Sequence, residues 1–281
     1  MRVNKSHMSD RPGCAKCAES APGIEFAFAF QPIVSVKSHT VFAHEALARG
    51  PQGQPADSVL GQVTWENRHR FDQECRMRAI EQAAALDMRE SLSINFIPNA
   101  VTDPRACLRG TLRAAADCGF DLSRLIFEVT ESEKIVDAET LVRIFREYRK
   151  LGIKTAIDDF GAGYAGLNLL ARFQPDIVKI DIDLVRDVHA NKTKQIIVEN
   201  IVSLCDKLGV IPLAEGVETV EEREFLSSIG IDLMQGFLFA RPAFNAIAPM
   251  NDDAWLPPQP EICRGRSRSD IGNGLDKLPL E

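Results

Sequence analysis

Short apolar runs alternate with amphipathic segments from residue 26 to residue 239, and this alternation restricts the possible folds more than any other feature. The apolar runs predict strands at 26–34, 41–47, 92–97, 125–129, 155–157, 177–180, 210–214 and 233–239. Strands that alternate with helices are typical of parallel sheets with helical crossovers. Eight such strands favour a closed barrel over an open sheet. The expected fold class is therefore α/β, with the strands closed into a barrel.

Three of the intervening segments keep an apolar face at helical spacing. Their apolar positions are Phe71, Cys75, Ala79, Ala83 and Leu86 in the first, Leu141, Ile144, Phe145, Tyr148 and Leu151 in the second, and Ile197, Ile201, Leu204, Cys205 and Leu208 in the third.

Two details depart from an ideal barrel. Only residues 37–40 join the first two predicted strands. A helical crossover needs a dozen or more residues, so the first strand should run antiparallel to the second. Pro212 lies inside a predicted strand, where it cannot donate a ladder hydrogen bond, and this favours a bulge or an edge position there.

The chain ends differ from the middle. Residues 1–22 are polar and predict a flexible arm, residues 23–250 form the predicted domain, and residues 251–281, which include RGRSRSDIGNG, predict a disordered tail. The arm holds a CxxC, Cys14 and Cys17. One interpretation is a redox pair or half of a metal site. The other is two free thiols, and it is favoured because no second CxxC or CxxH completes a tetrahedral set of metal ligands.

Composition narrows the function classes. The formal net charge is -7, which argues against a protein that coats polymeric nucleic acid. No run approaches the roughly 20 apolar residues of a membrane helix, and the N-terminus lacks the apolar core of a secretory signal. Seven scattered cysteines without such a signal indicate reduced thiols, so a cytoplasmic location is expected.

Six predicted strands end in a polar side chain. These residues are Asn95, Glu128, Asp158 (followed by Asp159), Lys179, Glu215 and Gln235. The carboxyl ends of barrel strands meet at one mouth, where active sites lie. Strand alternation adds Glu45 and Arg49 on one face of an early strand, with Arg49 suited to binding a phosphate.

Burying several carboxylates in one small volume has a prohibitive free-energy cost unless cations neutralise their charges. Carboxylate and amide oxygens are hard ligands, suited to Mg²⁺ or Mn²⁺. Asp158 and Asp159 at one strand end suit two adjacent ions that share a ligand. Two such ions are typical of phosphoryl transfer, in which they stabilise the attacking and leaving oxygens.

These residues also lie in motifs that resemble those of the EAL-domain cyclic di-GMP phosphodiesterases. The motifs keep the family's order over roughly residues 24–244: FQPIV, HEALAR, SINFIP, FEVTES, IDDFGAGY, VKID, AEGVET and MQGFLFARP. The resemblance implies a modified TIM (β/α)8 barrel whose first strand is antiparallel. It also implies metal-dependent hydrolysis of one phosphodiester of cyclic di-GMP to linear pGpG.

The resemblance assigns roles to particular residues. It implies two Mg²⁺ or Mn²⁺ ions, with Glu45, Asn95, Glu128 and Asp158 on one and Asp158, Asp159 and Glu215 on the other. Lys179 would orient the attacking water, Glu215 is the best general base, and Gln235 would hydrogen-bond a metal-bound water. The substrate-binding residues would be Gln31, Leu47, Arg49, Glu218 and Pro242. Glu131 would anchor the loop after Asp159, and that loop often joins a homodimer interface in this family.

The loop after Asp159 departs from the family pattern DDFGTGYSSL. Ala162 replaces the Thr, and Ala165 and Gly166 replace the two Ser. The lost hydroxyls remove hydrogen bonds worth about 0.5–1.5 kcal/mol each, which affects loop order and dimer coupling more than catalysis.

Two alternatives to a cyclic di-GMP phosphodiesterase stay open. One is a catalytically silent receptor of EAL-like fold that binds cyclic di-GMP or a protein. The other is a barrel enzyme for a different phosphate ester or cyclic dinucleotide. The chain shows no sensor domain, so regulation would come through the arm, a homodimer or a separate sensor partner.

Overall fold

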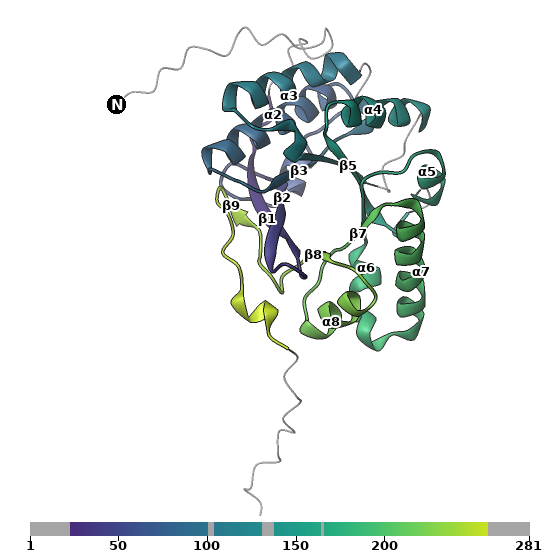
Figure 1. Ribbon diagram of the computed structural model, residues 1–281. Helices are drawn as coiled ribbons and strands as arrows, with labels where there is room; N and C mark the ends of the chain where they lie inside the picture. The colour runs from purple at the N-terminus through teal and green to yellow at the C-terminus, as the bar shows by residue number, and fades with distance from the viewer. Residues whose placement is uncertain (1–22, 101–103, 131–137, 164–165, 258–281) are drawn as a thin grey trace, which may run out of the picture.

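A closed barrel forms the centre of the molecule (Figure 1). The structure, a computed structural model, describes residues 23–100, 104–130, 138–163 and 166–257. Within these ranges the barrel strands are β1 (Ala27–Ser35), β2 (Thr40–Arg49), β3 (Ser91–Asn95), β4 (Leu125–Thr130), β5 (Lys154–Phe160), β6 (Ile177–Ile180), β7 (Ile211–Ala214) and β8 (Leu233–Gln235). Neighbours from β2 to β8 pair in parallel, and β1 closes the barrel antiparallel to both β2 and β8. The predicted fold class and the antiparallel first strand are confirmed. A short strand, β9 (Ala243–Phe244), also pairs with β1.

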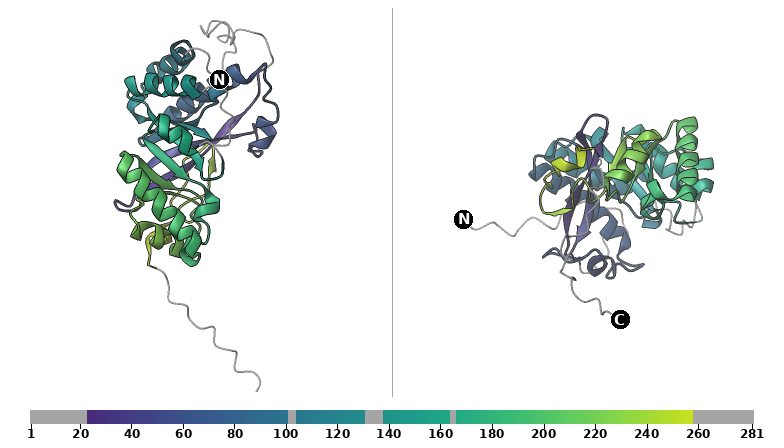
Figure 2. Two further views of the ribbon diagram at one scale, coloured as in Figure 1. Left: turned by 90° about the vertical axis from the view of Figure 1, so that its right-hand side faces the viewer. Right: turned by 90° about the horizontal axis from the view of Figure 1, so that it is seen from below.

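Helices surround the barrel, as the three views show (Figures 1 and 2). The α-helices are α1 (Asp57–Leu60), α2 (Arg68–Ala85), α3 (Pro104–Cys118), α4 (Ala138–Lys150), α5 (Gly166–Arg172), α6 (Ile182–Val185), α7 (Lys192–Leu208) and α8 (Val220–Ser228). Short 3-10 turns are η2 (Pro98–Ala100), η3 (Leu122–Arg124), η4 (Val188–Ala190) and η5 (Asp252–Trp255). No helix in the described ranges combines the length and the apolar character that a bilayer crossing requires.

The predicted helix faces are largely confirmed. In α2 and α4 the predicted apolar positions within each helix are buried, and they pack in one core cluster. The face predicted for α7 is wrong at its edges, because Ile197 is 41% exposed and Leu208 is 38% exposed. The helix instead buries Val198 and Cys205, which lie seven residues apart, two helical turns, on one side.

One strand prediction is wrong, and another is confirmed in one of its two forms. The strand β8 ends at Gln235 rather than at Phe239, because the chain turns at Gly236. A Cβ at Gly236 would lie 2.0 Å from the carbonyl oxygen of Val217, so only glycine fits this close approach. A bulge or an edge position was predicted at Pro212, and the bulge is absent, since β7 pairs with β6 without a register shift. Pro212 has the predicted edge position instead, because it pairs with β6 only and pairing with β8 begins at Leu213.

The folded body extends beyond the predicted domain end at residue 250. The first part of the expected tail, 251–257, forms η5 and packs against the barrel. Ala254 is fully buried, and the ring of Trp255 stacks on His39 at a centroid distance of 4.8 Å. Arg223 of α8 donates to the carbonyl oxygens of Ala254 and Leu256. Residues 258–281, and the arm 1–22 with Cys14 and Cys17, lie outside the described residues.

Candidate active site

The barrel interior has two layers, one apolar and one polar. The apolar layer is a single buried cluster that contains Ile33, Ala43, Ile126, Ala156, Ile177, Leu213 and Leu233. In a strand, the residue two positions after an interior residue also faces the interior. On six strands the residue two positions after the member of this apolar cluster is polar. These residues are Glu45, Glu128, Asp158, Lys179, Glu215 and Gln235. The sequence therefore sets the polar residues as a second layer, nearer the mouth of the barrel.

Lys179 holds four of these carboxylates together. Its Nζ lies 2.8 Å from Glu215 Oε1 and 2.9 Å from both Glu128 Oε2 and Asp158 Oδ1. Glu45 Oε2 is 3.5 Å from the same nitrogen. The side chain of Lys179 is only 1% exposed, so this charge is neutralised by the carboxylates and not by solvent.

A β-bulge places two consecutive aspartates at this position. Ile157 pairs with Val178, and the next pair is Phe160 with Ile180, so Asp158 and Asp159 together face Lys179. Asp159 has φ +55, in the left-handed region that a short acidic side chain tolerates. In a regular strand, two successive side chains would point to opposite faces. The bulge removes this constraint on β5, as bulges often do beside active sites.

The carboxylates form two overlapping triads. Glu45, Glu128 and Asp158 each offer an oxygen, and these oxygens lie within 4.8 Å of one another. Asp158, Asp159 and Glu215 meet the same limit. Asp158 belongs to both triads. This donor set of hard oxygens fits a pair of Mg²⁺ or Mn²⁺ ions that share one ligand.

Amide and hydroxyl groups orient the carboxylates. The Nδ2 of Asn95 donates to Glu45 Oε1 at 2.9 Å, and the Nε2 of Gln235 donates to Glu45 Oε2 at 2.8 Å. Gln235 Nε2 also lies 3.2 Å from Gln31 Oε1, while Gln235 Oε1 is buried without a hydrogen-bond partner. The hydroxyl of Ser93 donates to Glu128 Oε1. Sequence reasoning missed Ser93, although its place two residues before Asn95 on an alternating strand was a usable signal.

Burial and the ammonium group shift the pKa values in opposite directions. Desolvation raises the pKa of Glu128 to about 8, although Lys179 opposes the shift. Desolvation, with the nearby charge of Asp158, raises the pKa of Asp159 to about 6. Burial also raises the pKa of Glu215 well above its usual range. For Asp158 the desolvation is outweighed by Lys179 and by hydrogen bonds, so its pKa is lowered. The acids therefore differ in the ease with which they give up a proton.

The predicted substrate-binding residues occupy varied positions. Gln31 is buried beside Gln235, and Leu47, Arg49 and Pro242 are half-buried. The guanidinium of Arg49 donates to the carbonyl oxygen of Ala48. Glu218 is exposed and pairs with Arg186 at 3.3 Å, and it is not a member of either carboxylate triad. Glu131, the predicted loop anchor, lies outside the described residues.

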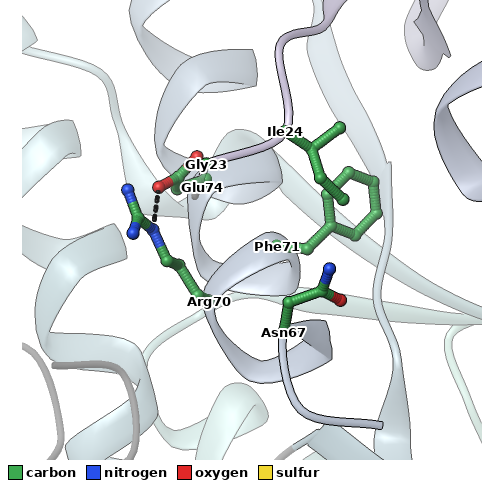
Figure 3. A pocket seen from close by; sticks show the side chains of 6 residues that line it. All are labelled: Gly23, Ile24, Asn67, Arg70, Phe71 and Glu74. Atoms are coloured by element: carbon green, nitrogen blue, oxygen red, sulfur yellow. Dashed lines mark hydrogen bonds and ion pairs between the residues drawn. The ribbon is translucent and has the colours of Figure 1, made fainter. Parts of the chain in front are cut away.

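A cavity lies where the described chain begins (Figure 3). Its lining residues are Gly23, Ile24, Asn67, Arg70, Phe71 and Glu74. Arg70 and Glu74 form an ion pair at 2.7 Å across its edge. The cavity shares no residue with the carboxylate triads, so it is not an extension of the candidate active site.

The sequence and the fold of this chain are both similar to those of known EAL proteins. Residues 20–242 match the EAL domain. A solved standalone EAL protein from Vibrio cholerae O395, in its c-di-GMP bound form, is 45% identical with a TM-score of 0.81, and the match covers 83% of this chain and 99% of that one. A manganese and cy-diGMP complex of BlrP1 from Klebsiella pneumoniae is 41% identical with a TM-score of 0.74, over 80% of this chain and 58% of that one.

Curated relatives are longer than this chain. The blue light- and temperature-regulated antirepressor BluF of Escherichia coli K12 is 35% identical over 232 residues, which are 82% of this chain and 57% of BluF. Several other relatives are named cyclic di-GMP phosphodiesterases, and the chain spans less than a third of their length.

Proposed function

The chain belongs to the EAL domain family, and from this premise we propose that it hydrolyses one phosphodiester bond of cyclic di-GMP to give linear pGpG. The observation that carries the proposal is the pair of carboxylate triads that share Asp158 around the ammonium of Lys179. The relatives named as cyclic di-GMP phosphodiesterases and the solved neighbours with bound cyclic di-GMP support the substrate.

Two divalent cations, Mg²⁺ or Mn²⁺, fit the donor set. Glu45, Asn95, Glu128 and Asp158 would hold one ion, and Asp158, Asp159 and Glu215 the other. When bound, such ions activate a water molecule near neutral pH and stabilise charge on the attacking and leaving oxygens. The neighbour solved with manganese supports this assignment.

Three further side chains would each have a separate role in the reaction. Lys179, fixed by four carboxylates, would hold the attacking water in line and stabilise negative charge on the phosphate. Glu215 would accept a proton, because burial makes this carboxylate more basic than an exposed one. Gln235 would keep Glu45 in place and offer its buried Oε1 to a water.

Substrate binding would fall to residues at the mouth of the barrel. We assign Gln31, Leu47, Arg49, Glu218 and Pro242 to the groove for cyclic di-GMP. Arg49 would bind a phosphate through its guanidinium. A homodimer, a loop anchor at Glu131, a cytoplasmic location and a separate sensor partner complete the proposal.

Incubation of the purified protein with cyclic di-GMP tests this function. We expect pGpG in the presence of Mg²⁺ or Mn²⁺ and none with EDTA. The variant Glu45→Ala should lose turnover, and Glu199→Gln, an exposed change on α7, should retain it. Faster hydrolysis of a simple phosphomonoester would contradict the substrate assignment.

A regulatory receptor is the second candidate, and the relative named as an antirepressor favours it. A receptor would bind cyclic di-GMP without producing pGpG, and its binding could survive Glu45→Ala. Binding without turnover in the assay above would therefore support the receptor and contradict the enzyme.

A further inference from the structure

A buried ion pair on α2 lies outside the set of residues assigned to catalysis. Arg76 is completely buried and Asp72 is 2% exposed, and Arg76 Nη2 donates to Asp72 Oδ2. A buried ion pair is weak evidence for stability, because desolvation offsets much of the attraction. Stability alone therefore does not explain why Asp72 and Arg76 are buried here.

The second carboxylate oxygen of Asp72 contacts the segment that follows β3. Asp72 Oδ1 accepts a hydrogen bond from the backbone N–H of Ile97 at 2.9 Å. One helical turn earlier, the His69 ring contacts the carbonyl oxygen of Ala100 through Nδ1. Two side chains of α2 thus hold the residues after Asn95 at the mouth of the barrel.

Asn95 depends on this support because strand pairing ends beside it. The pairing between β2 and β3 stops at Ala46 and Ile94, whereas β4 still pairs Glu128 with Asn95. The backbone after Asn95 is then held on one side only, where Phe96 N–H donates to the carbonyl oxygen of Glu128 at 3.0 Å. Asp72 supplies the next attachment along the chain.

We propose that Asp72 is a positioning residue for Asn95. By accepting from the backbone N–H of Ile97, Asp72 keeps the side-chain Nδ2 of Asn95 on Glu45. The side-chain Oδ1 of Asn95 is then left to bind the cation of the first triad. Arg76 holds the Asp72 carboxylate in the orientation that this contact requires. The cation part of this inference rests on the proposed function, whereas the backbone part does not.

Hydrogen exchange of the cation-free protein tests the backbone part. Arg76 and Ile97 bind different oxygens of Asp72, and Asp72→Asn turns one of them into an NH2 group that cannot accept. Because the buried charge of Arg76 keeps the remaining oxygen, the Ile97 N–H loses its acceptor, and amides in residues 95–100 should exchange at least about tenfold faster. The control Leu226→Ala creates a cavity in a different core cluster, and it should leave exchange in this segment unchanged. Unchanged exchange in Asp72→Asn, or equal acceleration in the control, would overturn the proposal.

A second variant covers the case in which Asp72→Asn fails to fold. Asp72→Ala combined with Arg76→Met removes both charges, so no unpaired buried charge is left. It also removes the bond to Ile97, and the same faster exchange in residues 95–100 is expected.

Mn²⁺ affinity, measured by calorimetry, tests the link to Asn95. Loss of an outer-shell partner typically lowers metal affinity about 10- to 100-fold, and we expect a loss in this range for Asp72→Asn. In an Asn95→Ala background the same change should cost less than about twofold, since the positioned group is gone. Equal losses in both backgrounds would show that Asp72 acts on the fold and not through Asn95. If the wild type bound no Mn²⁺, the proposed function would fail, and the exchange result would still decide the backbone part.

Discussion

Lys179 Nζ lies 2.9 Å from Asp158 Oδ1, at the point where two residues of β5 face one residue of β6. The ammonium also touches Glu45, Glu128 and Glu215. One cation side chain therefore stabilises, in the absence of metal, the same carboxylates that would bind two divalent ions. This relationship makes the cation-free and cation-bound proteins respond differently to mutation and to pH.

Replacement of the ammonium should reveal its structural role. We expect Lys179→Met to lower the free energy of unfolding of the cation-free protein by about 3–5 kcal/mol, because it leaves buried carboxylates without their partner. Added Mg²⁺ should restore much of this loss, whereas pGpG formation should stay at least about 100-fold reduced. Urea unfolding with EDTA or Mg²⁺ and an activity assay measure both effects. Lys207→Met, an exposed change on α7, is the control, and a stability loss no larger than in this control would contradict the prediction.

The bulge on β5 predicts a selective loss of one cation. Asn tolerates the left-handed backbone of Asp159, so Asp159→Asn should fold normally. It removes one charged oxygen from the second triad only. We expect the number of Mn²⁺ ions bound per chain to fall from two to one and activity to fall about 100-fold. Calorimetry gives the stoichiometry, and two ions with unchanged affinity in the variant would refute the assignment of Asp159.

The position of the polar layer was predictable from the sequence because strand alternation is local. The step from Ile126 to Glu128 or from Leu213 to Glu215 needs no knowledge of neighbouring strands. The antiparallel first strand was predictable for a similar reason, since residues 37–40 are too few for a crossover. The strand positions whose polar side chains lie together in the barrel were therefore predictable without the structure.

The features that the sequence did not predict depend on contacts between elements. The bulge at Asp158 and Asp159 is defined by the register of β5 against β6. The buried face of α7 depends on the surfaces it packs against, and the helical pattern alone placed Ile197 on the wrong side. The ordered turn at 252–255 depends on contacts from Arg223 and His39, which lie far away in the chain.

The stability of the cation-free protein should fall as the pH rises. The pKa of Glu128 in the folded protein is about 8, above its ordinary 4.5, so the folded state binds more protons than the unfolded state between these values. The resulting stabilisation is complete below about pH 4.5 and is lost as the pH rises through about 8. Cations compete with that proton, so Mn²⁺ affinity should rise over the same range. Urea midpoints at pH 5.5 and 8.5, with EDTA and with Mn²⁺, measure both trends, and a cation-free midpoint that rises between these pH values would disprove the assignment.

The segment 251–257 should be required for full stability. A chain that ends at Met250 loses the buried Ala254 and the stacking of Trp255 on His39, and it leaves the nearly buried Arg223 without two of its acceptors. Loss of a fully buried Trp side chain costs about 3–5 kcal/mol, and loss of the half-buried Trp255 should cost less than this. We therefore expect a clear drop in the urea midpoint relative to a chain that ends at Pro257, which keeps all of these contacts and serves as the matched control. Equal midpoints for the two truncated chains would show that the turn only rests on the barrel. A smaller loss is expected for Trp255→Ala, because this variant retains the carbonyl groups that Arg223 binds.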